Sequence, residues 1–364
     1  MKRTNTAVWI EKYNRWQINV QKDGIRKSFY SGTPGRTGQR ECNRKADDWL
    51  DDNISGASLK VSELSERYME QLKLTTSQSH WRQYQGYFDN WINKHIGTVK
   101  IDNLSEYYLQ SVINKAYAKG LKKKTLQNIK ACMLSFLKFC RSCKATTLMV
   151  EGLSIPKGAE SKPKFILKPD DLKVLFSVDT TIDHRKRVPE QYINAYRFEV
   201  LTGLRPGEIV GLKWSDIQTA TVSLQRSINA YQETTKGKND NARRTFDLNE
   251  LTNAVLIDQK CFLQEYHIIS DYVFPNTMGN PVRQNTYYKH WIAYCEHNNL
   301  TKTSPYELRH TFVSISKSLP EGYLKQLVGH SKDMDTYGIY SHEVATDRAA
   351  AANMVQDIFS ALIK

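Results

Sequence analysis

The protein has 364 residues, 40% of them hydrophobic and 25% charged, which is enough for two or three domains with separate cores. Lys and Arg outnumber Asp and Glu by 52 to 38. The resulting formal net charge of +14 indicates a polyanionic partner, because each phosphate that a protein neutralises releases condensed counterions. No apolar run approaches the roughly twenty residues that cross a bilayer, so the composition argues against a membrane protein.

Positive charge is concentrated in the first half of the chain. Residues 1–50 contain eleven basic and five acidic side chains, residues 51–163 contain seventeen and ten, and the remaining 201 residues contain twenty-four and twenty-three. The stretch from Tyr107 to Val150 carries nine Lys or Arg and no carboxylate. We expect this stretch to contact phosphates, with an ordinary solvated helix face as the alternative.

The cysteines indicate a reducing, intracellular compartment. The six are scattered along the chain, and we recognise no secretory or transit segment before them. Cys140 and Cys143 form one C-x-x-C pair, but no second Cys or His pair lies at zinc-finger spacing. We therefore expect no metal site at this pair.

The first 53 residues form a predicted β module. Two runs, Trp16–Val20 and Ile25–Tyr30, alternate apolar and polar residues around an Asp-Gly turn signal, which predicts a β-hairpin. After the Gly/Pro/Thr-rich stretch Gly32–Gly38, residues Glu41–Leu50 are expected to form a short helix on the sheet. A basic sheet face fits a DNA major groove. A protein-interaction or merely stabilising module is the alternative.

Residues 60–150 form a predicted helical domain. From Lys60 the apolar spacing becomes helical, and four or five helices to about Leu148 make a bundle. Two sets of apolar side chains each share one helix face: Val61, Leu64, Tyr68 and Leu72 in the first, and Tyr84, Tyr87, Phe88 and Trp91 in the second. The polar segment Leu153–Phe165, with two prolines, is the predicted linker.

Residues 165–364 form a predicted mixed α/β domain, mostly helical with a small antiparallel sheet. A helix is expected to start at Lys168–Asp171, and a longer one covers Gln191–Leu201. Two strands, Thr221–Tyr231 and Arg243–Leu248, follow around a basic loop, and helices then resume. The predicted fold class is therefore multidomain and mainly α, with a β module, a helical bundle and this third domain.

The segment from Thr202 to Trp214 predicts a helix, a glycine turn and a new helix with Pro206 near its first position. An arginine at that turn, Arg205, lies close to free backbone N–H groups and suits an anionic oxygen. An ion pair with Glu208, made for structure alone, is the other interpretation.

Three motifs in order resemble the signature boxes of the tyrosine recombinase, or phage integrase, family. Thr202–Trp214 is similar to the first box and Ser304–Phe312 to the second. Leu327–Ser331, followed by Tyr337–His342, is similar to the third. The resemblance spans residues 165 to 345 and implies a site-specific DNA recombinase of the bacterial cytoplasm. Such an enzyme cleaves and rejoins DNA through a covalent 3′-phosphotyrosine.

Transesterification of a phosphodiester needs positive charge on the non-bridging oxygens and a proton donor for the departing 5′ oxygen. The resemblance implies that Arg205 and Arg309 clamp the phosphate. His330 is expected to be a third hydrogen-bond donor to that phosphate or to accept and release a proton during the reaction. A core histidine that only makes structural hydrogen bonds is the alternative. Lys236, on the loop between the two strands, is the expected general acid, and Lys238 is its competitor.

Tyr340 is the expected nucleophile, and Tyr337, one helical turn earlier, is the competitor. The phosphotyrosine ester stores the energy of the broken bond, so no ATP, metal or other cofactor is expected. Tyr306 stands where the family's second box commonly has His. A phenol accepts a proton less readily than imidazole but hydrogen-bonds a phosphate oxygen. His310 is interpreted as structural support.

Beyond Tyr340, an apolar helical face is predicted at Met354, Val355, Ile358, Phe359, Leu362 and Ile363. The resemblance implies that it docks on a neighbouring protomer within a homotetramer on paired DNA sites. The alternative is that it folds back on its own domain.

The N-terminal module indicates an integrase of a phage or mobile element. The expected partner is double-stranded DNA, at core sites and at accessory arm sites, together with DNA-bending or directionality proteins. A chromosome-resolving recombinase or a type IB topoisomerase-like enzyme is a second hypothesis. A third is a non-catalytic DNA-binding or architectural protein with the same fold.

Overall fold

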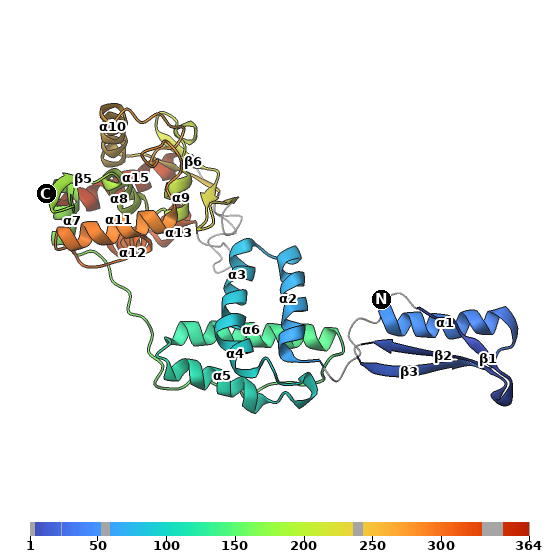
Figure 1. Ribbon diagram of the computed structural model, residues 1–364. Helices are drawn as coiled ribbons and strands as arrows, with labels where there is room; N and C mark the ends of the chain where they lie inside the picture. Colours follow the sequence, from blue (N-terminus) through green and yellow to red (C-terminus); the bar gives the residue numbers. More distant parts are fainter. Residues whose placement is uncertain (1–3, 23, 52–58, 236–242, 330–344, 364) are drawn as a thin grey trace. The chain divides into compact units, whose positions relative to one another are not determined.

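The computed structural model describes five stretches of the chain: residues 4–22, 24–51, 59–235, 243–329 and 345–363. The chain divides into two compact units, Met1–Lys162 and Pro163–Lys364 (Figure 1). The boundary falls inside the segment 153–165 that the sequence predicts to be a linker. Buried side chains form one hydrophobic cluster in the β module, one in the helical bundle and one in the C-terminal unit.

The β module is a three-stranded antiparallel sheet with one helix on it (Figure 1). Its elements are β1 Val8–Ile10, β2 Arg15–Lys22, β3 Ile25–Ser31 and α1 Gly35–Asp51. The predicted hairpin is confirmed, with Ile18 opposite Phe29, and β1 is an additional edge strand. Ile18 and Val20 are buried beneath the helix. The period of two that the sequence carries therefore separates an apolar face from a polar one.

Helix α1 begins earlier than the sequence predicts, because Gly38 serves close packing and does not end a loop. A Cβ at this position would lie 1.7 Å from the Thr33 carbonyl oxygen and 2.9 Å from the Trp16 ring. Glycine therefore lets the start of the helix pack closely against Thr33 and Trp16. A glycine inside a helix costs about 1 kcal/mol, and this close packing explains why it stands here.

The helical bundle contains the labelled helices α2 to α6, as expected: α2 Val61–Thr75, α3 Gln78–Tyr87, α4 Asn93–Ile96, α5 Glu106–Ala118 and α6 Lys123–Ser142. Both predicted apolar faces pack on its core. Helix α2 starts where the Glu63 carboxylate accepts the Lys60 N–H at 2.8 Å, which satisfies one of the free donors of the first turn.

The basic stretch from Tyr107 to Val150 is only in part a free surface. Lys123 and Lys124 are exposed at the start of α6. Lys130 and Arg141 instead donate to the carbonyls of Leu153 and Leu148, so they fasten the following segment to the bundle. The expectation that this stretch contacts phosphates stays a prediction, and it now concerns the exposed lysines.

The C-terminal unit has helices around small antiparallel strand pairs (Figure 1). Its helices are α7 Pro169–Ser177, α8 Ile193–Thr202, α9 Pro206–Gly211, α10 Glu250–Glu265, α11 Gln284–His297, α12 Pro305–Ile315, α13 Glu321–Val328 and α15 Ala345–Ile363. Its strands are β4 Thr180–Asp183, β5 Lys186–Pro189, β6 Thr221–Leu224, β7 Ser227–Ile228, β8 Thr234–Thr235 and β9 Arg244–Asp247. The predicted starts near Lys168 and Gln191 are confirmed within about two residues.

The strands of this unit differ from the prediction in two ways. The run Thr221–Tyr231 is not one strand, because Arg226 leaves the ladder and pairs with the buried Asp216, so that β6 and β7 have different partners. The hairpin β4–β5 was not expected from the sequence. Its turn residues His184 and Arg185 have φ of 45° and 67°, a conformation that Asn-Gly normally signals and that this sequence does not.

Helix α15 folds back on its own domain, which corrects the expectation that its apolar face docks on a neighbour. Val355 and Phe359 are buried in the core of the unit, and the Phe359 ring stacks on Phe312 at 6.2 Å between centroids. The Asn249 side chain donates to the Ala352 carbonyl at 2.9 Å. Burying Phe359 stabilises the domain by roughly 1.5–3 kcal/mol, so that face is already used within the chain.

Candidate active site

Arg205 lies at the turn between two helices. Helix α8 ends at Thr202 with Gly203 as its C-cap, and α9 begins at Pro206, whose ring suits the first helical position. The Arg205 backbone N–H donates to Glu208 Oε2 at 3.0 Å, and its Nη1 donates to Glu208 Oε1 at 2.8 Å. The carboxylate caps α9 and holds the guanidinium at once. The structural ion pair with Glu208 and the binding of an anionic oxygen by Arg205 are therefore not mutually exclusive.

Arg309, in the middle of α12, points at the same turn. Its Nη1 donates to the Gly203 carbonyl and its Nη2 to the Val328 carbonyl, both at 2.7 Å. Arg205 Nη2 donates to the next carbonyl, that of Gly329, at 3.4 Å. The structure therefore brings together two arginines that are far apart in the sequence, beside the last turn of α13.

A third arginine completes this cluster. Arg244, on β9, donates through Nη1 and Nη2 to the two oxygens of Glu208, at 3.2 Å and 3.0 Å. Its Nε donates to the Leu327 carbonyl at 2.8 Å. Burial would raise the pKa of the Glu208 carboxyl, but the guanidiniums of Arg244 and Arg205 outweigh it and hold that pKa below its usual value.

Arg244 was not among the site residues expected from the sequence. A weak signal for it exists in the strand pattern, because Arg244 and the buried Phe246 are two residues apart and so share one face of β9. An arginine on the inward face of a strand needs a buried acceptor. The identity of that acceptor, Glu208, could be seen only in the fold.

The cluster carries excess positive charge. Burial, and then the charges of Arg205 and Arg244, lower the pKa of Arg309 to about 10, so it stays protonated at neutral pH. Nearby, burial raises the pKa of the Glu199 carboxyl well above its usual value, which favours its uncharged form. Arg205 and Arg244 both contact the single carboxylate of Glu208, and Arg309 lies beside them, so guanidiniums are in excess at this turn. This charge suits a phosphodiester.

The hairpin that leads to the expected general acid lies against α9. Gly207 permits the approach, because a Cβ there would lie 2.5 Å from Ser227 Oγ and 2.9 Å from the Ile228 carbonyl oxygen. Strand β7 pairs with β8, which ends at Thr235. Lys236 and Lys238 follow directly and lie outside the described residues.

Of the remaining expected site residues, Tyr306 is described. It lies on the first turn of α12, and 46% of its surface is exposed, so its hydroxyl is accessible to a ligand. His310 packs edge-to-face on the Tyr306 ring at 5.1 Å, in keeping with the supporting role expected for it. His330, Tyr337 and Tyr340 lie outside the described residues.

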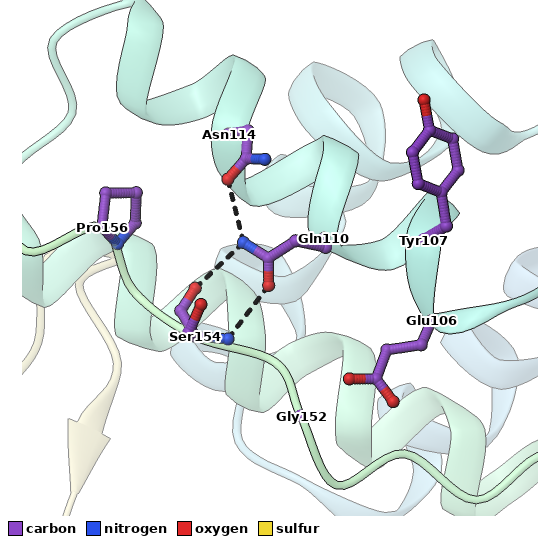
Figure 2. Close-up of a pocket in the computed structure, with 7 residues that line it drawn as sticks. All are labelled: Glu106, Tyr107, Gln110, Asn114, Gly152, Ser154 and Pro156. Carbon is purple, nitrogen blue, oxygen red and sulfur yellow. Dashed lines mark hydrogen bonds between the residues drawn. The ribbon is translucent and has the colours of Figure 1, made fainter.

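A shallow pocket of about 490 Å³ lies in the helical bundle (Figure 2). The Gln110 side chain donates to the Ser154 carbonyl at 3.1 Å and accepts the Ser154 N–H at 3.0 Å. Glu106 and Gly152 also line it (Figure 2). This lining has no cluster of cations comparable to that around Arg205. We therefore place the candidate chemistry at the arginines.

The C-x-x-C pair is divided between core and surface. Cys140 is buried in the bundle, and this burial raises the pKa of its thiol to about 12. Cys143 is half-buried. Within the described stretches, no group of three or more His, Cys, Asp or Glu could hold a metal ion. No helix among the described residues has both the length and the apolar character needed to cross a membrane.

Two family models match the chain. The model of the phage integrase family matches residues 166–346, and that of the phage integrase N-terminal SAM-like domain matches residues 60–117. A tyrosine recombinase XerC-like protein of Caldanaerobacter subterraneus subsp. tengcongensis is 22% identical, over 98% of this chain and 99% of that protein. The ICEBs1 integrase of Bacillus subtilis is 23% identical, over 78% and 79%.

Solved structures share the fold. The Tn1549 transposon integrase in complex with transposon right end DNA has a TM-score of 0.63 at 18% identity, covering 80% of this chain and 98% of that one. A lambda integrase tetramer bound to a Holliday junction has a TM-score of 0.58 at 14% identity, covering 95% and 99%. With both family models and the paired arginines in agreement, the chain belongs to the phage integrase family, the site-specific DNA recombinases of the tyrosine class.

Proposed function

We propose that this recombinase integrates and excises a phage or other mobile element, and that it cleaves DNA through a 3′-phosphotyrosine formed on Tyr340. The observation that carries the proposal is the convergence of Arg205 and Arg309 beside one turn, with Arg309 buried and Arg205 mostly buried. Charge that is held in place before the reaction stabilises the developing phosphorane more than mobile charge does. A groove that only bound DNA would not need such burial.

In the proposed reaction, Arg205 and Arg309 hold the non-bridging oxygens while the Tyr340 oxygen attacks phosphorus. The bond to the 5′ oxygen breaks, and Lys236 donates a proton to that oxygen. Two of the five N–H groups of Arg309 donate to main-chain carbonyls. We assign its phosphate contact to the others. The ester conserves the bond energy, so rejoining requires no ATP, metal or other cofactor.

Tyr306 and His330 have supporting roles in this mechanism. The exposed hydroxyl of Tyr306 donates a hydrogen bond to a phosphate oxygen, while His330 donates to the same phosphate or manages a proton. Because the phenol does not accept a proton as imidazole does, water or another group takes the proton of Tyr340. Lys238 and Tyr337 are the competitors for the acid and the nucleophile.

The first unit is proposed to bind double-stranded DNA inside the bacterial cell. The helical bundle holds the core site, and the β module holds an arm site through the sheet face opposite α1. The strand register puts Gln17 beside Tyr30 and Asn19 beside Ser28 on that face. Arg15 stacks over Tyr30, with its Cζ 4.0 Å from the ring centroid. A sheet face with polar and aromatic side chains of this kind suits the major groove, which admits β-strands.

Assembly is proposed to be a homotetramer on paired sites, helped by DNA-bending or directionality proteins. Support comes from the lambda integrase, which is described as a tetramer on a Holliday junction. Because Val355 and Phe359 of α15 are already buried in their own domain, we expect contact between protomers to use other surfaces. Sedimentation of the protein on a synthetic four-way junction tests this proposal. A tetramer places one protomer on each of the four arms, so complexes with no more than two protomers per junction would contradict it.

A covalent adduct tests the proposed function. The cleavage position is first mapped on DNA flanking the gene, and a nicked duplex with that site is then incubated with the full chain. We expect a protein–DNA adduct that survives denaturant, is lost in Tyr340→Phe and persists in Tyr337→Phe. Tyr306→Phe should slow its formation by about tenfold or more, because the lost hydrogen bond is made to a charged oxygen. An adduct that Tyr340→Phe still forms contradicts the assignment.

A further inference from the structure

The last turn of α13 is held by three arginines from three different elements. Helix α13 leaves carbonyl groups without helical partners at its C-terminal end, as every helix does. The consecutive carbonyls of Leu327, Val328 and Gly329 accept hydrogen bonds from Arg244 on β9, Arg309 on α12 and Arg205 before α9, respectively. This turn is therefore the point at which the strand and both helices meet.

The three guanidiniums differ in exposure. The side chain of Arg205 is 19% exposed, that of Arg244 is 9% exposed, and Arg309 is 3% exposed. Arg205 therefore offers the most surface to an entering phosphate. Arg244 directs its Nη atoms at the Glu208 carboxylate and its Nε at the Leu327 carbonyl, so these groups are directed into the protein.

Arg244 also sets the charge balance on Glu208. The carboxylate is almost fully buried and accepts bonds from both Arg205 and Arg244. With Arg244 absent, Arg205 alone would have to compensate a buried negative charge, and the attraction would compete with its contact to phosphate. The forked geometry that spans two carboxylate oxygens and a carbonyl is available to Arg but not to Lys.

We propose that Arg244 is a positioning residue of the recombination site, which occupies Glu208 and anchors the α13 turn so that Arg205 and Arg309 face the phosphate in one fixed orientation. This inference rests on the proposed function. It assigns to β9 a role in the chemistry separate from that of the loop lysine before it. Arg244 itself does not touch the phosphate.

The test compares two DNA substrates that carry the mapped crossover site. One has a normal scissile phosphate and the other a methylphosphonate, in which a methyl group replaces one charged oxygen. A variant that has lost a guanidinium from the phosphate itself should regain rate on the neutral substrate, because less charge then needs stabilising. A variant that has only lost positioning keeps its phosphate-binding guanidiniums, so it should regain less.

For Arg244→Gln we expect single-turnover cleavage of the normal substrate to fall roughly a hundredfold, the usual cost of a misplaced catalytic group, with DNA affinity nearly unchanged. The methylphosphonate should restore Arg205→Ala by at least about tenfold and restore Arg244→Gln clearly less, because both phosphate-binding guanidiniums are still present in that variant. Arg244→Lys should cleave faster than Arg244→Gln and slower than the parent.

Arg226→Gln is the matched control, because Arg226 also pairs with a buried carboxylate, that of Asp216, and donates to the Gly211 carbonyl at 3.4 Å. It should lose thermal stability as Arg244→Gln does but keep its cleavage rate. Unchanged cleavage in Arg244→Gln overturns the proposal, and so does a rescue by the methylphosphonate as large as that of Arg205→Ala, which would make Arg244 a phosphate ligand. An equal loss of cleavage in Arg226→Gln also overturns it. Absence of any adduct with the parent protein contradicts the proposed function instead.

Discussion

The two units of this recombinase use positive charge in different ways. Residues 1–162 contain 28 basic and 15 acidic side chains, a surplus of 13, whereas residues 163–364 contain 24 and 23, a surplus of one. In the first unit several lysines are exposed, as at the start of α6. In the second, nearly balanced overall, three guanidiniums surround one buried carboxylate. We therefore expect net charge to mark the DNA-binding unit and local burial to mark the proposed reaction site.

The largest effect is expected from Arg205 in the second unit. Arg205→Ala should lower single-turnover cleavage about 10²–10³-fold, the usual loss for one donor to a developing oxyanion. DNA affinity should change less than about threefold, because the many other phosphate-binding side chains remain. Rapid-quench cleavage at saturating DNA and a filter-binding titration measure the two quantities. A parallel fall in rate and affinity would mean that the cluster grips DNA as the first unit does.

For the start of α6 we expect the reverse of the Arg205→Ala result, namely a loss of DNA affinity with an unchanged cleavage rate. Lys123 and Lys124 lie in its first turn without an acidic neighbour there, and cations at a helix N-terminus cost about 0.3–1 kcal/mol each. The double variant Lys123→Gln, Lys124→Gln should bind DNA roughly tenfold more weakly, with a salt dependence that is shallower by about 0.9 for each phosphate that is no longer neutralised. Its melting temperature should rise slightly, and its cleavage rate at saturating DNA should stay the same.

Lys130→Gln is the matched control for that double variant. Lys130 donates to the Leu153 carbonyl, so its loss should lower the melting temperature and leave the salt dependence nearly as in the parent. If the salt dependence of Lys123→Gln, Lys124→Gln equals that of the parent, these lysines are an ordinary solvated face and the comparison between the units fails for α6.

The smallest effect on the reaction is expected from Glu199, where the variant tests whether this buried carboxyl is uncharged. Glu199 is buried, and the Tyr287 hydroxyl donates to its Oε2 at 2.8 Å. Burial raises the pKa of this carboxyl well above its usual value, so folding takes up a proton. The associated stability is fully present below the unfolded pKa of about 4.3 and is lost as the pH rises through the folded pKa.

Glu199→Gln stays neutral and should not lose this stability. Urea unfolding should show the variant gaining stability relative to the parent as the pH rises above the unfolded pKa of about 4.3, with cleavage nearly unchanged. The exposed Glu265→Gln should show no such trend. A difference that does not depend on pH would contradict the raised pKa of Glu199.

Much of the fold follows from local patterns. Alternation around an Asp-Gly turn predicted β2 and β3, and helical spacing predicted the faces of α2 and α3. The sequence missed β4–β5, where His184 and Arg185 adopt positive φ without a turn signal. It also placed the start of α1 too late, because the reason for Gly38 is its close approach to Thr33. Both errors concern backbone positions that the surrounding chain determines.

For the site, the sequence by itself determined the kinds of residue and their local order. Arg205 before Pro206 and Arg309 within its helix follow from short motifs, because capping and helical spacing act over a few residues. Only the tertiary structure decided that both arginines meet at the end of α13, that Arg244 completes the cluster and that α15 is buried in its own domain. Those outcomes depend on packing between distant segments, which share no local pattern.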